Sequence, residues 1–357
     1  MFEASFQILV YKVILLIFCL IISLYYLIKN KLSGSILLKN FFLYSLFVFV
    51  LLFVGIRDWK SELFVDSEGY GNTYLLSSVY TEVDNTGKDI GFTWLSSICS
   101  SLGLPVNVFF FICSFLYIFP LLILSAKLSF NDAVILFLMI ISSMSFYAYG
   151  VNTIRAGMAA SIMFYSFLYY KNRGWMFLMM FISLSMHMSF FIPMIMFILT
   201  LYYNNIKLNI FIWIISILAS FVGGEYIKQI ALNFDFISDR VYEYFTTAPE
   251  LGTFSMIGFR WDFLLYGSVP ILEGIYFVFK RKYNNQFYCI LLSTYILTNA
   301  FWVLINEVPF SDRFAYLSWF MMPVVIIYPI LFNNKLKYRN CIIFFTLNFY
   351  YLFTFLI

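Results

Sequence analysis

Long apolar runs, separated by short polar breaks, cover most of the sequence. They lie near residues 6–28, 41–56, 106–126, 133–149, 152–170, 208–223, 262–279, 287–304, 314–331 and 341–357, with one longer run at 175–203. Runs of about 20 apolar residues are typical of helices that cross a bilayer. These runs are apolar on every face, whereas the strands of a membrane β-barrel alternate apolar and polar residues. The pattern therefore predicts an all-α, polytopic integral membrane protein.

The composition excludes several classes of protein. Of the 357 residues, 63% are hydrophobic and 11% are charged, whereas soluble domains average about 25% charged residues. The net charge of +4 is small and dispersed, so no nucleic-acid partner is expected. The five cysteines show no metal-binding spacing. We expect a single transmembrane domain over residues 1–357, with a first helix that is retained rather than cleaved.

The distribution of charge indicates how the run at 175–203 is folded. If this run crosses the membrane once, basic residues divide almost evenly between the two faces, against the positive-inside rule. If it enters and returns as two short helices, 13 of the 22 basic residues and only one acid, Asp132, fall on the inner face. We therefore expect about twelve membrane-crossing helices, including this fold-back pair, with both chain termini on the outer face.

The tip of the expected fold-back is the segment 186–189, Met-His-Met-Ser. Each arm is too short to span the bilayer, and non-helical backbone at that depth requires a polar cavity or surrounding protein. His187 is thus expected at the floor of a cavity that opens to the outer face. Two long outer loops, 57–105 and 224–261, carry most of the acids, and the stretch 92–102 is expected to lie as an amphipathic helix along the interface.

Ionisable and amide side chains gather on the predicted outer face, where each is a candidate for a functional site. They are Arg57, Asp66, Asn152, Arg155, Arg260, Asp262, Asp312 and Arg313. A guanidinium group keeps its charge and presents a planar fork of donors, so the four arginines suit a pyrophosphate ligand. The alternative is that each arginine only reaches lipid headgroups. Arg155 is the strongest candidate, because Asn152 lies one turn away on the same helical face.

His187 is the only histidine in the chain, and imidazole exchanges protons readily near neutral pH. It is therefore the candidate general base, with Asp66 as the second candidate. The alternative is a histidine that only hydrogen-bonds across the broken helices. A Ser-His-Asp nucleophile built from Ser189, His187 and Asp66 is disfavoured, because no glycine-flanked elbow surrounds the serine. No second histidine or cysteine cluster is present to complete a metal site.

Six short segments occur in an order that resembles the EpsG/Wzy family of bacterial polysaccharide polymerases, which includes O-antigen polymerases. They are Val54-Gly55-Ile56-Arg57 leading to Asp66, Tyr70 and Tyr74; Gly91-Phe92 followed by Leu95; Asn152 with Arg155; His187 with Ser189; Gly258-Phe259-Arg260-Trp261-Asp262-Phe263; and Asp312-Arg313-Phe314-Ala315-Tyr316. Two positions depart from the family's pattern. Ala156 follows Arg155 where an Arg-Gln pair is common, and Asp89-Ile90 stands where a Glu-Pro pair is common.

The resemblance implies a glycosyltransferase that uses undecaprenyl-pyrophosphate-linked oligosaccharides as donor and acceptor. It places the reaction at the periplasmic face of the bacterial inner membrane, with the lipid bilayer, a chain-length regulator and a flippase as further partners. No cofactor is implied, because the lipid pyrophosphate already activates the donor. The implied roles are catalysis for His187 or Asp66, pyrophosphate or substrate binding for Arg57, Asn152, Arg155, Ser189, Arg260 and Arg313, and further contacts for Tyr70, Asp262 and Asp312.

Two other classes of membrane protein have similar hydropathy. A lipid-linked oligosaccharide flippase or other transporter usually shows paired halves with matching broken helices, whereas only one break is expected here, at His187. A membrane acyltransferase would also use a histidine, but it needs access to its acyl donor from the inside, where the predicted loops are short and basic. The flippase is the leading alternative to a polymerase.

Overall fold

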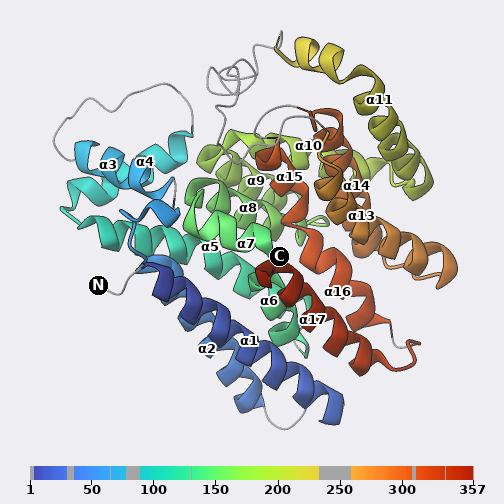
Figure 1. Cartoon of the computed structure of the whole chain (residues 1–357), viewed down its shortest axis with the longest axis horizontal. Coiled ribbons are helices and arrows are strands. Elements are labelled where there is room, and N and C mark those ends of the chain that lie inside the picture. The colour runs from blue at the N-terminus through green and yellow to red at the C-terminus, as the bar shows by residue number, and fades with distance from the viewer. Residues whose placement is uncertain are drawn as a thin grey trace. The chain divides into compact units, whose positions relative to one another are not determined.

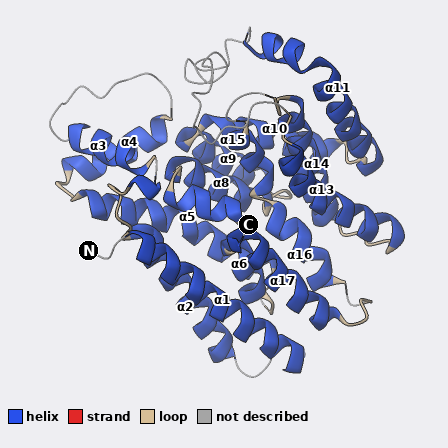
Figure 2. Cartoon of the chain, viewed as in Figure 1, coloured by secondary structure: helices blue, strands red, loops and turns tan. Residues whose placement is uncertain are grey.

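The computed structural model describes residues 4–29, 36–64, 66–77, 89–129, 131–232, 259–307, 311–333 and 335–356. Over these residues the backbone forms helices joined by short connections, and the same residues contain no strand (Figures 1 and 2). The all-α prediction is confirmed.

The helices follow the predicted apolar runs closely. In chain order they are α1 (Ala4–Lys29), α2 (Ile36–Gly55), η1 (Glu62–Phe64), α3 (Ser67–Ser77), α4 (Ile90–Ser101), α5 (Val106–Leu128), α6 (Ala133–Ile141), α7 (Met144–Val151), α8 (Ile154–Phe167), α9 (Arg173–Met186), η2 (Met188–Phe190), α10 (Phe191–Tyr202), α11 (Ile206–Leu232), α13 (Trp261–Ile275), η3 (Tyr276–Lys280), α14 (Gln286–Leu304), α15 (Asp312–Trp319), α16 (Met322–Phe332) and α17 (Arg339–Leu356).

The prediction of twelve membrane-crossing helices is not confirmed. Among the described residues, seven helices are long and apolar enough to cross a membrane, or up to eight if the broken pair α6 and α7, bent by 64°, is one span. Helices α8 and α9 have 14 residues each and α10 has 12, which is fewer than the roughly 20 that a full crossing needs. Average hydropathy does not reveal the breaks between α6 and α7 or between α9 and α10, because a few polar residues interrupt runs that stay apolar on average. The seven long apolar helices nevertheless indicate a membrane protein.

The two long outer loops are not confirmed either. The segment 57–105 contains η1, α3 and α4 in its described part, so much of it is helical. The expected helix at 92–102 is present as α4, one of whose faces exposes Ile90, Trp94 and Ile98. In the second segment, α11 extends to Leu232, and residues 233–258 lie outside the described part of the chain.

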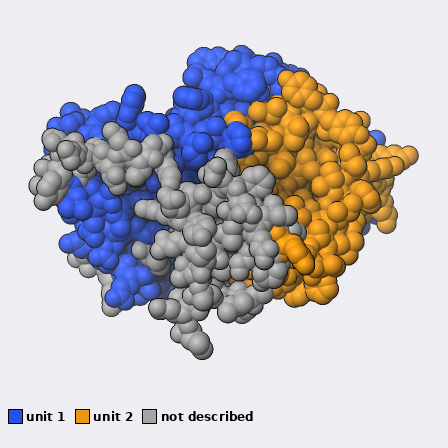
Figure 3. Space-filling view, turned by 90° about the horizontal axis from the view of Figure 1, so that it is seen from above, with its two compact units in different colours: residues 1–191, 330–357 blue, residues 192–329 orange. Residues whose placement is uncertain are grey.

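The described chain divides into two compact units, coloured separately in Figure 3. Unit 1 comprises residues 1–191 and 330–357, and unit 2 comprises residues 192–329. Each unit is described by itself below. The expected single transmembrane domain stays a prediction.

Unit 1 is organised around the buried helix α6. All nine residues of α6 are buried, so this helix occupies the centre of the core. Helix α5 packs against both α2 and α8, and α8 packs in turn against α9. Helices α1 and α17, the first and last of the described chain, pack against each other.

The two ends of α5 carry different chemistry. At its first turn, the ring of Phe109 stacks on Tyr74 at 4.4 Å and meets Phe92 at 5.9 Å. At its last turn, the Lys127 ammonium donates to the hydroxyl of Tyr165 at 3.0 Å. A helix of 23 residues is about 35 Å long. Within unit 1, α5 therefore separates groups that the charge distribution assigns to opposite faces.

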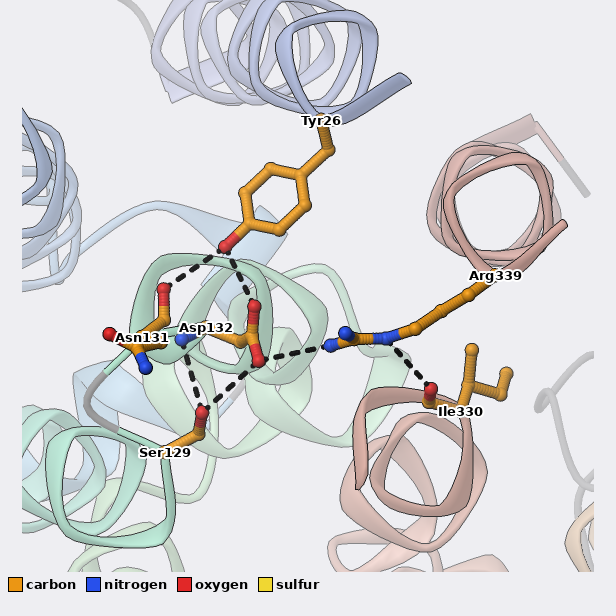
Figure 4. A network of polar contacts seen from close by, with 6 residues as sticks. All are labelled: Tyr26, Ser129, Asn131, Asp132, Ile330 and Arg339. Atoms are coloured by element: carbon orange, nitrogen blue, oxygen red, sulfur yellow. Dashed lines mark hydrogen bonds and ion pairs between the residues drawn. The ribbon is translucent and has the colours of Figure 1, made fainter. Parts of the chain in front are cut away.

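A polar network beyond the last turn of α5 joins the first and last helices of unit 1 (Figure 4). Asp132 accepts hydrogen bonds from the Tyr26 hydroxyl at 3.0 Å and from the Ser129 hydroxyl at 3.3 Å. Arg339 forms an ion pair with Asp132 at 3.1 Å, and its Nε donates to the Ile330 carbonyl at 3.2 Å. The only acid predicted on the inner face is thus bonded on both carboxylate oxygens.

Candidate functional site

The site in unit 1 is centred on the carboxylate of Asp89, which is 7% exposed. Its Oδ2 lies 3.1 Å from His187 Nδ1 and 2.9 Å from Arg155 Nη1. Its Oδ1 accepts the backbone N–H of Met188 at 3.1 Å. One buried carboxylate therefore joins the start of α4, the start of α8 and the break that follows α9.

The backbone around the break explains how His187 reaches this carboxylate. Helix α9 ends at Met186, and His187 is extended, with φ −161° and ψ 116°. A continuing helix would direct the N–H of Met188 to the carbonyl of Leu184, but this N–H bonds to Asp89 instead. The predicted interruption of the run 175–203 at His187 is therefore present, as two helices too short to span. The reversal of direction at the break stays a prediction.

Asp89 itself has a left-handed backbone, with φ 55° and ψ 46°. This conformation costs roughly 1 kcal/mol for a residue other than glycine. Asp89 occupies the N-cap position of α4, yet its side chain makes no capping hydrogen bond. The carboxylate is turned away from its own helix and toward α9, and such local strain is common at functional sites.

The charge of Asp89 follows from its contacts. Burial by itself raises the pKa of the carboxyl group, but the hydrogen bond with His187, the charges of His187 and Arg155 and the N–H of Met188 together lower it below its ordinary value. Asp89 is therefore ionised at neutral pH and can only accept hydrogen bonds. In neutral His187, Nδ1 must then carry the proton, which leaves Nε2 as an acceptor facing the Ser189 hydroxyl at 3.3 Å.

Arg155 lies at the second residue of α8, between two aromatic rings. Its guanidinium carbon is 5.6 Å from the centre of the Tyr70 ring and 5.8 Å from that of Phe92. The side chain is 23% exposed. Its Nε and the Oδ1 of Asn152 are buried and have no hydrogen-bond partner within the described part of the protein. Arg155 thus keeps donor capacity beyond its bond to Asp89.

Arg57 is buried, with 3% of its surface exposed. Its Nε donates to the Ser67 hydroxyl at 3.1 Å, its Nη1 bonds to the Val54 carbonyl, and the guanidinium lies 4.7 Å from the centre of the Phe110 ring. Burial lowers the pKa of Arg57 to about 10, so the side chain stays charged near neutral pH. These contacts tie the end of α2 to α3. The role of Arg57 as a pyrophosphate ligand stays a prediction.

The carboxylate that contacts His187 is that of Asp89. Asp66 lies directly before α3, where its carbonyl accepts the N–H of Tyr70 at 3.3 Å. In the sequence, Asp89 was noted only because Asp89-Ile90 stands where the family commonly has a Glu-Pro pair. Its contact with His187 was not predicted. An acid two residues before the Gly91-Phe92 pair was the available signal.

The remaining predicted residues belong to unit 2. Arg260 donates from Nε and Nη2 to the two carboxylate oxygens of Asp262, at 3.0 and 2.7 Å, and lies over the Phe263 ring at 3.6 Å. Arg313 lies in the first turn of α15 and is exposed. The side chain of Asp312 is outside the described part of the structure. Their contribution to a site shared with unit 1 stays a prediction.

Comparison with known families identifies the chain. The model of the EpsG family matches residues 40–357, which include the contacts around Asp89. The chain belongs to the EpsG family. The resemblance found from the short segments is thereby confirmed, and EpsG membership suggests a glycosyltransferase-like, polysaccharide polymerase role. No curated protein and no solved structure shows significant similarity to this EpsG family member.

Proposed function

We propose that the protein is a polysaccharide polymerase, more specifically an O-antigen or exopolysaccharide polymerase. It transfers a glycan chain from its lipid pyrophosphate carrier onto an oligosaccharide repeat linked to undecaprenyl pyrophosphate. We place the reaction at the periplasmic face of the bacterial inner membrane. The observation that carries the proposal is the contact of one buried carboxylate with both an imidazole and an arginine, in a chain of the EpsG family.

The reaction needs a base and a cation. The acceptor hydroxyl attacks the anomeric carbon of the donor, and a new carbon–oxygen bond forms as the bond to the lipid pyrophosphate breaks. The hydroxyl proton passes to His187 Nε2, and the pyrophosphate leaves with the bonding electron pair. Arg155 faces the charge that builds on this leaving group, and fixed cations at such a position lower the barrier by several kcal/mol.

The surroundings of Arg155 favour an anion. The guanidinium lies in the first turn of α8, where backbone N–H groups and the helix dipole also favour negative charge. Its Nε and Asn152 Oδ1 both lack partners in the described structure. The arginine donates to an oxygen of the pyrophosphate, and the amide oxygen accepts from a hydroxyl of the adjoining sugar.

Deletion of the gene in its host tests the function class. A polymerase mutant still carries lipid-linked single repeats to the surface, so a gel of the surface polysaccharide shows single-repeat products. Loss of all repeats would instead support the flippase alternative and contradict the proposal.

Substitution of His187 tests the mechanism with purified enzyme and defined lipid-linked repeats. We expect both His187→Asn and His187→Gln to lower kcat by about 10²- to 10⁴-fold, because neither amide takes up the proton. The asparagine amide lies where Nδ1 does and can still donate to Asp89. Near-normal turnover in His187→Gln together with an inactive Asp66→Asn would assign the base to Asp66 and leave His187 structural.

A further inference from the structure

Asp89 takes no proton in the proposed reaction, yet it contacts both groups that the reaction uses. We propose that Asp89 is a positioning residue that holds His187 in the tautomer whose Nε2 is unprotonated and keeps this base beside Arg155. The inference rests on the proposed function, since it assigns Asp89 a role that acts through His187.

The first step of the argument concerns the proton on the imidazole ring. Asp89 Oδ2 lies 3.1 Å from Nδ1, and a carboxylate accepts but does not donate. Without this partner, the neutral ring is free to place its proton on either nitrogen. With it, the proton stays on Nδ1, and Nε2 is the atom that faces Ser189 and is ready to accept.

The second step concerns distance. His187 Nδ1 and Arg155 Nη1 contact the same oxygen atom, at 3.1 and 2.9 Å. The two nitrogens therefore cannot lie farther apart than the sum of these distances. Nε2, the proton acceptor, belongs to the same ring as Nδ1, so the base and the pyrophosphate-binding cation are held in one site, where a single anomeric carbon can meet both its nucleophile and its leaving group.

The third step concerns the backbone, which is arranged to place this carboxylate. Asp89 adopts a left-handed conformation and leaves α4 without a side-chain cap. Gly91 lets α4 approach α9 closely, because a Cβ at this position would lie 3.0 Å from the Cβ and 3.1 Å from the carbonyl carbon of Ser185. The left-handed backbone of Asp89 and the close approach of α4 to α9 both bring the Asp89 carboxylate into contact with the break at His187.

Because the chain has one histidine, its tautomer can be measured directly in the full-length protein. We would label the histidine with ¹⁵N and record solid-state NMR spectra in lipid bilayers at a pH where the ring is neutral. The expected spectrum is that of the Nδ1–H form. A wild-type protein with the proton on Nε2 would overturn the proposal without any substitution.

Two substitutions of Asp89 then test its effect on turnover. Asp89→Asn keeps the shape and tolerates the left-handed backbone, but its amide group can donate to Nδ1 and so permits the wrong tautomer. We expect a shift toward the Nε2–H form and a fall in kcat of about 10²- to 10⁴-fold. Asp89→Glu keeps the charge and should recover part of the rate. Glu68→Gln, an exposed acid on α3, is the matched control and should have normal rates.

The outcomes separate this inference from the proposed function. An inactive His187→Gln combined with normal turnover and an unchanged tautomer in Asp89→Asn would overturn the role of Asp89 alone. Full activity of His187→Gln would overturn the proposed base itself. If Asp89→Asn does not fold, the wild-type spectrum still decides, because an Nε2–H wild type by itself contradicts the proposal. The rate of Asp89→Glu is then the second test, and we expect it to exceed that of His187→Gln.

Discussion

Arg155 is the residue at which charge and geometry can be separated most cleanly. We expect Arg155→Lys to reduce kcat/KM for polymerisation by about 10- to 100-fold, although the charge is kept. A lysine provides a point charge, whereas the guanidinium can hold Asp89 with Nη1 while its other nitrogens reach the pyrophosphate. The measurement is a rate on defined lipid-linked repeats. Full-length polymer at normal expression would contradict the role, and Arg281→Lys, at an exposed position, is the control for the substitution itself.

Individual residues were predictable where the sequence offers few alternatives. His187 is the sole histidine, and Arg155 was expected one helical turn after Asn152, so the sequence predicted both, and Asp89 connects them in the structure. The shared helical face of Asn152 and Arg155 is wrong, because α7 ends at Val151 and α8 begins only at Ile154. Asp89 was missed because it is one of 18 acidic residues, and its place two residues before Gly91-Phe92 was the one local feature that set it apart from solvated acids. Its partner lies 98 positions along the chain, and the contact depends on the packing of α4 against α9, which sequence patterns do not specify.

At the scale of elements, the packing of α4 against α9 depends on Gly91. We expect Gly91→Ala to push these helices apart, because the new Cβ meets the backbone of Ser185 as well as its side chain. Overpacking of this kind costs about 1–3 kcal/mol, and a displacement of Asp89 by about 1 Å can lower turnover by about 10²-fold. Polymerisation rate and thermal unfolding in detergent would both be measured.

Gly69 provides the matched control for this substitution. It lies on α3, and a Cβ there meets nothing within 4 Å. Gly69→Ala should therefore leave the rate normal and slightly raise the stability of the helix. Ser185→Gly combined with Gly91→Ala should recover part of the lost activity, because it removes the side chain that the alanine meets. A normal rate in Gly91→Ala alone would show that this close approach is not needed.

The helices themselves were largely predictable, and their interruptions only in part. Apolar runs located α1, α2, α5 and α14 because a helix of about 20 apolar residues has few alternatives in a bilayer. The break at His187 was expected from the charge distribution. The break between α6 and α7 was not expected, because Ser142 and Ser143 are small residues within an apolar run. In the structure, Ser143 caps α7 by accepting the N–H of Phe146 at 3.1 Å.

The network around Asp132 acts at the scale of unit 1, since it joins α1, the α5–α6 connection and α17 (Figure 4). We expect Arg339→Met to lower the free energy of unfolding by about 1–3 kcal/mol, because it removes the ion-pair and hydrogen-bond partner of a mostly buried carboxylate. A double-mutant cycle with Asp132→Asn should show that the two losses are not additive. Lys335→Met, an exposed neighbour, is the control. Additive losses would show that the ion pair contributes little.

For the whole molecule, the sidedness of the chain is the prediction with the widest consequences. The charge distribution places Lys280, Arg281 and Lys282 inside only if the run 175–203 turns back, and the helices at its break are each too short to span. We therefore expect a reporter fused after Lys282 to be cytoplasmic. A reporter after Gly103, between α4 and α5, should be periplasmic, on the side of Asp89 and His187. A periplasmic reporter after Lys282 would mean that the run 175–203 crosses the membrane once. The fold-back at His187 would then be wrong. The proposed base could still act in that arrangement, but the cavity expected above His187 would lose its justification from charge.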